Sequence, residues 1–169
     1  KGEDDVPFFS PDGKRMYFIS RRPVPDDARG RSERIWFTDR TAEGWAEPKP
    51  LDPNVNSVDM HWAFSLDRGQ IVYFAGRSPD GLGMSDIYVA RFKDGKYEKP
   101  VNLGEPVNSA AIEDSPFVAP DGSFLLFRSL GRGGVMDPNY YYSSAGAEGA
   151  WTEPVNIAKK VNKIGLFPS

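Results

Sequence analysis

Short runs of hydrophobic residues, separated by turn-forming residues, extend over the whole chain. In the first part of the chain one run covers residues 7–10 and another covers 16–20, with the sequence SPDG between their cores. Proline presets φ at the second position of such a turn, and glycine accepts the positive φ that closes a hairpin. Short runs rich in aromatic residues are typical of strands, and no stretch shows the 3.6-residue period of a helix. The pattern predicts an all-β protein.

The same pattern occurs three times, with a period near 54 residues. The turn aspartates Asp12, Asp67 and Asp121 lie 55 and 54 residues apart. Each copy then continues with a third apolar run, a turn that contains glycine, a segment that contains proline, and a Val-Asn pair. The third runs are 35–38, 87–90 and 140–143, the prolines are Pro48, Pro100 and Pro154, and the Val-Asn pairs lie at 55–56, 107–108 and 161–162. The shared order indicates an internal repeat.

Each copy predicts a four-stranded antiparallel unit. The second runs, at 16–20, 71–75 and 124–129, are almost continuously apolar, as expected for strands covered on both faces. The fourth strand carries the proline, which cannot donate to a ladder, so this strand lies at an edge. A unit of this kind is a propeller blade. A β-sandwich would explain the strands but not the fixed period. The second copy has Leu66-Asp67-Arg68-Gly69 in place of SPDG, and we expect a longer turn there.

The predicted fold is therefore an all-β β-propeller, of which this chain supplies three four-stranded antiparallel blades in a ring of about six or seven. Residues 1–169 form one partial propeller, with blades over about 3–57, 58–109 and 110–162, and 163–169 starting a further blade. Three blades leave an apolar face bare at each end of the stack. Further blades of the same polypeptide, which we favour, or a second copy of the chain would close the ring.

Several of these segments resemble one known repeat family. The SPDG hairpin, the aromatic second strand, the DIY sequence of the third strand and the connector EPVNLGEPVNS are similar to the TolB-type propeller repeat, which is WD-repeat-like. The resemblance covers essentially the whole chain, and its motifs are specific to a fold rather than to a function. It implies an exported bacterial protein of the periplasm or cell envelope, of a kind often fused to peptidoglycan-binding or peptidase domains.

Charge and composition exclude several classes of function. The chain has 21 basic and 24 acidic residues, well mixed, so it lacks the basic stripe that nucleic acid requires and the polybasic segment that attracts anionic membranes. No apolar stretch approaches the roughly 20 residues of a membrane span. Cysteine is absent and histidine occurs once, which leaves no disulfide framework and no His-rich metal site. No catalytic motif is present, so we expect no catalytic residue, metal or cofactor.

Long loops are the expected place for binding residues. The loops at 21–33, 76–85 and 130–138 should emerge on one face together with the links between blades. Asp4, Asp59 and Glu113 are spaced by 55 and 54 residues, and we expect them at equivalent positions near the central channel. They could form a partial acidic ring for a cation, an amine or a peptide N-terminus. We favour a structural role instead, in which Arg21 and Arg77 pair with acids of neighbouring blades.

Two further candidates interrupt the repeat. His61 and Trp62 stand where the other copies have Val6-Pro7 and Ser115-Pro116. Trp62 could stack on a sugar or peptide, with His61 supplying a polar tip, or it could fill a gap between blades. We lean slightly to the second interpretation. The aromatic residues Trp45, Tyr97 and Trp151 share one repeat position, which predicts packing between blades.

Together these features favour a non-catalytic binding or scaffold module of a bacterial cell-envelope protein, which recognises a protein, peptide or cell-wall glycan through its loop face. One alternative is the propeller part of a hydrolase or lyase whose catalytic residues lie outside this chain. Another is a purely structural oligomerisation module. We expect no nucleic-acid partner and no insertion into a membrane.

Overall fold

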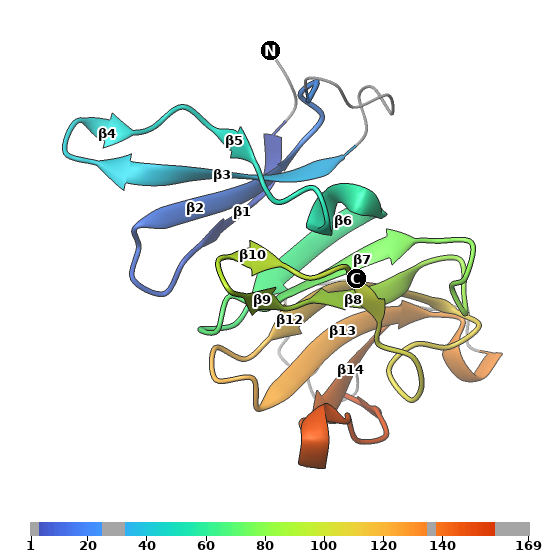
Figure 1. Ribbon diagram of the computed structural model, residues 1–169. Helices are drawn as coiled ribbons and strands as arrows, with labels where there is room; N and C mark the ends of the chain where they lie inside the picture. Colours follow the sequence, from blue (N-terminus) through green and yellow to red (C-terminus); the bar gives the residue numbers. More distant parts are fainter. Residues whose placement is uncertain (1–3, 25–32, 135–137, 158–169) are drawn as a thin grey trace, which may run out of the picture.

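Strands form almost all of the regular structure. The computed structural model describes residues 4–24, 33–134 and 138–157, with the side chains of residues 60–62 and 148 outside that description. Its strands make three larger antiparallel sheets, one from each copy of the repeat, and a separate two-stranded one. The three larger sheets follow one another through the molecule (Figure 1). The prediction of an all-β chain is confirmed. The sheets of the described residues form an open stack.

Within each sheet the strands follow one another in chain order from one edge to the other. The first sheet contains β1 (Asp4–Phe9), β2 (Arg15–Ser20), β3 (Arg34–Thr41), β4 (Gly44–Trp45) and β5 (Lys49–Pro50), the last two both paired with β3. The second contains β6 (Asp59–Leu66), β7 (Val72–Arg77), β8 (Asp86–Ala90) and β11 (Val101–Asn102), beside a small hairpin of β9 (Phe92–Lys93) and β10 (Lys96–Tyr97). The third contains β12 (Ile112–Val118), β13 (Phe124–Leu130), β14 (Asn139–Ser144) and β15 (Val155–Asn156). Short 3₁₀ turns, η1 (Val55–Ser57), η2 (Arg132–Gly134) and η3 (Ala147–Gly149), lie between strands. No helix in these ranges is long or apolar enough to cross a membrane.

Two hydrophobic cores lie between the three sheets. We call the side of a sheet toward the next sheet along the chain its forward face, and the opposite side its rear face. In the second sheet Phe74 and Tyr88 belong to the core shared with the first sheet, whereas Tyr73 and Ile87 belong to the core shared with the third. Side chains alternate between faces along a strand, so β7 and β8 supply both cores at once. This double burial explains their continuous apolar sequence.

The turn between β6 and β7 differs from the expectation. Leu66 pairs with Val72 and leaves residues 67–71 in the turn, whereas the other two copies leave 10–15 and 119–124. The prediction of a longer turn was wrong, because this turn is one residue shorter. Gln70 rather than Gly69 takes the positive φ, at 62°, in the place that Gly122 takes in the third copy, at 73°.

Candidate functional site

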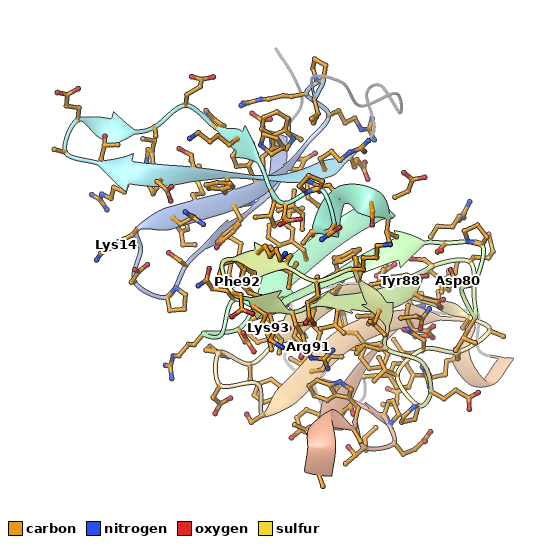
Figure 2. The ribbon with its side chains drawn as sticks, in the orientation of Figure 1. Lys14, Asp80, Tyr88, Arg91, Phe92 and Lys93 are labelled. Carbon is orange, nitrogen blue, oxygen red and sulfur yellow. The ribbon has the colours of Figure 1, made fainter. Side chains whose placement is uncertain are left out.

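The long loops gather at one end of the sheets. In Figure 1 the loops that follow β7 and β13 lie toward the right of the view, and the tight hairpins lie toward the left. Figure 2 labels Tyr88 and Asp80 toward the loop end, and Lys14 and Phe92 toward the hairpin end. The loops that the sequence singles out therefore share one side of the second and third sheets, and we refer to that side as the loop end.

The loop between β7 and β8 is held by the first residue of β8. The carboxylate of Asp86, which is buried, accepts hydrogen bonds from the backbone N–H groups of Leu82 at 2.6 Å and Gly83 at 3.1 Å. Asn102 of β11 donates a third bond to the same carboxylate at 2.8 Å. Asp86, the aspartate of the DIY sequence, thus holds the loop that precedes it through its own carboxylate. The hydrogen bonds leave the side chains at the tip free to face outward.

This loop also packs tightly on the segment that links the second sheet to the third. A Cβ atom added to Gly83 would lie 1.9 Å from the carbonyl oxygen of Ala111 and 2.7 Å from that of Ser109. Only glycine permits so close an approach of two backbones. The N–H of Met84 donates to the Ala111 carbonyl at 3.3 Å, and Arg77 donates through Nε to the Met84 carbonyl at 2.9 Å. The backbone of Met84 is therefore fixed from two sides.

A groove of about 440 Å³ opens beside Met84. Its walls are Met84 itself, the linking segment 109–112, and residues 130–133 at the end of β13. Met84 is 61% exposed and Leu82, two residues earlier, is 49% exposed. Met84 and Leu82 thus present apolar side chains on a loop whose backbone is held by Asp86 and by the Ala111 carbonyl. A flexible thioether such as that of Met84 adapts to varied apolar partners.

A buried ion pair supports two of the groove residues. Glu113 is completely buried, and its carboxylate accepts bonds from the Ser109 N–H at 3.0 Å and the Ser109 hydroxyl at 2.7 Å. It also accepts a bond from the Ser129 hydroxyl at 2.8 Å and pairs with the Arg132 guanidinium at 3.3 Å. Arg132 further donates to the carbonyls of Pro106 and Val107. These contacts fix both walls of the groove to the third sheet.

The predicted acidic residues have three different surroundings. Asp4 accepts a hydrogen bond from Arg22 at 2.6 Å and borders a separate cavity on the rear face of the first sheet. Asp59 is exposed and lies opposite Arg77 in the ladder, whereas Asp4 and Glu113 lie opposite Ser20 and Ser129. In the described ranges Glu113 is enclosed by its own partners. The ladder therefore places Asp4 and Glu113 at matching positions, whereas Asp59 pairs one residue further along the second strand of its sheet, with Arg77 instead of Gly76.

The predicted arginines act inside their own sheets. Arg21 donates to Glu33 at 2.7 Å across the loop between β2 and β3, and Arg77 supports Met84 as described above. His61 and Trp62 lie in β6 where its pairing with β7 is interrupted, between Met60 and Phe64, and their side chains fall outside the described set. Tyr97 and Trp151 pack into the two cores, as their shared repeat position predicts, whereas Trp45 at the same repeat position is 43% exposed and lies in neither core.

Hydrogen bonding and burial shift two ionisation equilibria at the loop end. The Ser78 hydroxyl donates to the Asp80 carboxylate and lowers the pKa of Asp80 below its ordinary value of 3.8. Burial raises the pKa of the Tyr88 phenol above 10. Asp80 is therefore anionic and Tyr88 neutral over the physiological range. Within the described part of the chain, no three His, Cys, Asp or Glu side chains are grouped so that they could hold a metal ion.

Met84, Asp86 and Arg132 were not among the residues predicted from the sequence. The Gly-rich loops that contain or border them were identified, and one signal was visible there. Leu82-Gly83-Met84 places two large apolar residues around a glycine inside an otherwise polar loop. Arg132 gave no such signal, because only the fold brings it to Glu113. Comparison with protein-family models gives no match for this chain, and comparison with curated proteins gives none either.

Proposed function

We propose that this chain is a non-catalytic binding module, made of three blades of a TolB-type β-propeller, that recognises a protein or peptide segment through the groove at its loop end. The repeat motifs support a propeller of about six or seven blades in an exported, cell-envelope protein. The exposed Met84 side chain beside the groove supports the binding role. A cell-wall glycan is the less favoured ligand, because the groove walls are mostly aliphatic and glycine residues.

The shape and chemistry of the groove define the segment that would fit. Ala111, Ile112 and Leu130 give it apolar walls, and the flexible Met84 side chain lies at its rim. A segment that inserts one leucine or phenylalanine side chain would bury apolar surface on both sides. The support beneath the groove, from Asp86 and Glu113, keeps the walls in place before the ligand arrives, which lowers the entropic cost of binding.

The methyl resonance of Met84 provides a direct test. With methionine methyl groups isotopically labelled, we expect peptides that carry Leu or Phe at one position to shift the Met84 signal, and the same peptides with Ala to leave it unchanged. Met16, on the rear face of the first sheet, supplies the internal control. The proposal fails if no peptide shifts the Met84 signal, or if soluble peptidoglycan fragments alone do so.

A pair of variants distinguishes binding at the groove from non-specific apolar contact. Met84→Glu should weaken peptide binding at least tenfold. Val101→Glu should not, since Val101 is similarly exposed, at 56%, but lies on the outer strand β11. Equal losses in both variants would point to non-specific apolar contact.

A further inference from the structure

The turn between β6 and β7 departs from the repeat at two positions. Gln70 takes the place of the glycine that closes each of the other two turns, and it does so with a positive φ of 62°. A glutamine residue rarely adopts this conformation. Arg68 takes the place of the prolines Pro11 and Pro120, and its N–H donates to the Pro120 carbonyl at 2.8 Å. Residues held in unfavourable backbone conformations occur most often where their side chains have a function.

Both of these side chains border a cavity of about 420 Å³ at the hairpin end of the molecule. The first sheet supplies the other walls, from the turn after β1, from the first and third residues of β2, and from Asp39 of β3. The cavity therefore lies at the contact between two neighbouring sheets, away from either end of the stack. Figure 2 labels one of the wall residues, Lys14, at this hairpin end.

The two carboxylates in the wall are already engaged. Asp12 accepts bonds from the Ser10 hydroxyl at 2.6 Å and from the Lys14 N–H at 3.0 Å, and these bonds lower the pKa of Asp12 below its ordinary value of 3.8. Asp39 accepts two bonds from the guanidinium of Arg15, at 2.6 Å from Nε and at 3.0 Å from a terminal nitrogen. Both carboxylates are therefore held within the wall by hydrogen bonds of the first sheet.

The cations in the wall outnumber these carboxylates. Lys14, Arg15 and Arg68 line the cavity with two acids, although the chain as a whole carries a net charge of −3. In the part of the chain that the structure describes, the side chains of Lys14 and Arg68 form no hydrogen bond and no ion pair. The low pKa of Asp121 comes mainly from its Ser123 hydrogen bonds and only slightly from the charge of Arg68. The cavity therefore has an excess of positive charge.

Arg15 is the cation whose position is fixed. Its pair with Asp39 holds one edge of the guanidinium, and the guanidinium carbon lies 4.2 Å from the centroid of the Phe37 ring, which supports one face. A guanidinium has more N–H groups than this pair uses, so others remain for an acceptor. The planar arrangement of these groups matches the oxygens of a carboxylate or a phosphate. The Gln70 amide adds a neutral donor from the second sheet.

We infer that this cavity binds an oxyanion, the carboxylate or phosphate group of a small molecule, through the cations Lys14, Arg15 and Arg68. The Gln70 amide is an additional donor to the same group. This role explains the unfavourable φ of the turn, because a glycine at position 70 would relax the backbone but remove the donor. The inference concerns the hairpin end and is independent of the groove at the loop end.

Titration with inorganic phosphate and with succinate, followed by NMR on the backbone amide signals, tests this site. Chloride at the same ionic strength is the reference. We expect phosphate, succinate or both to shift the Arg68 and Gln70 amide signals saturably. A response to phosphate alone identifies a phosphate-bearing ligand, and a response to succinate alone identifies a carboxylate-bearing one. The inference is wrong if neither anion gives a saturable shift beyond that of chloride.

Substitutions in the wall locate the site, and one outside it controls for charge. Arg68→Gln and Lys14→Gln each remove one cation and should weaken binding of the anion about tenfold. Gln70→Gly should weaken it about threefold although it relieves the backbone, a combination that a purely structural turn would not show. Lys93→Gln removes an exposed lysine of β9 that is not part of the cavity walls, so this variant should bind like the wild-type chain. All four positions are exposed, and thermal unfolding should show that the variants remain folded. Equal losses in Lys93→Gln and Arg68→Gln would mean that only overall charge matters, and the inference would then be wrong.

Discussion

Asn108 makes a closed pair of hydrogen bonds with the backbone of Ile87. Its side-chain Oδ1 accepts from the Ile87 N–H at 2.8 Å, and its Nδ2 donates to the Ile87 carbonyl at 2.8 Å. Asn56 repeats the pair with Ile35, at 2.9 Å and 3.1 Å. The asparagines of the first two Val-Asn pairs therefore tie the links between sheets to the start of the third strand. The same pair in the third copy, at 161–162, lies outside the described residues.

Removing this side chain should be costly. Asn108 is 1% exposed, so Asn108→Ala leaves the buried N–H of Ile87 without its partner, whereas the Ile87 carbonyl keeps the bond from the Leu103 N–H at 3.0 Å. One orphaned buried polar group costs about 1–3 kcal/mol, so we expect a loss of about 1–3 kcal/mol in the free energy of unfolding. Urea denaturation measures it. Asn108→Asp keeps the acceptor but not the donors and should fall between alanine and the wild type. A loss below about 0.5 kcal/mol in the alanine variant would contradict this role.

The repeat made the strands predictable, whereas contacts between distant residues were not. Gly13 and Gly122 have positive φ, at 66° and 73°, as the SPDG turn requires. Turn chemistry is local, so the sequence contains it. The shorter turn after β6 was missed because its length depends on the register with β7. The environment of Glu113 was missed for a related reason, since Arg132 reaches it only through the packing of the third sheet.

The turns after β1, β6 and β12 offer a matched pair of substitutions. Gly122→Val forces a β-branched residue into positive φ and should lower the free energy of unfolding by about 1–3 kcal/mol. Gln70 already has positive φ, at 62°, without being glycine. Gln70→Gly relieves that strain and should raise stability by about 0.5–1 kcal/mol, net of the entropy that glycine loses on folding. Chemical denaturation of both variants checks the signs. Destabilisation by Gln70→Gly would show that the turn is assigned wrongly.

Acid titration should detect the hydrogen bonds of the Asp121 carboxylate in the turn between β12 and β13. The Ser123 hydroxyl donates to Asp121 at 2.6 Å and the Ser123 N–H donates at 3.1 Å, and together they lower the pKa of Asp121 below 3.8. A carboxyl whose pKa is lower in the folded state stabilises the fold above its ordinary pKa, and this contribution is lost as the pH falls. Ser123→Ala should raise the pKa of Asp121, measured by NMR, while the remaining N–H bond keeps it below 3.8. Ser109→Ala, which touches a different carboxylate, is the control and should leave Asp121 unchanged.

The ion pair beneath the groove should be more costly to break than to remove. Glu113 is 0% exposed and the Arg132 side chain is 16% exposed, so Glu113→Gln leaves a largely buried cation without its counter-charge. Loss of one partner of a buried ion pair costs about 3–5 kcal/mol. Because glutamine retains one acceptor oxygen, we expect the free energy of unfolding to fall by about 2–4 kcal/mol.

Adding Arg132→Met to Glu113→Gln removes the unpaired cation and keeps an apolar side chain near Phe127 and Tyr141, over whose rings the guanidinium now lies at 5.6 Å and 5.4 Å. The double variant should therefore be less destabilised than the sum of the two single variants, by about 1–3 kcal/mol in a double-mutant cycle followed by urea denaturation. The position of the Met84 methyl resonance, measured in the same variants, shows whether the groove keeps its shape, because Ser109 and Arg132 form part of its walls. Strictly additive losses would mean that Glu113 and Arg132 contribute independently, and the support for the groove would then come from the serine hydrogen bonds alone.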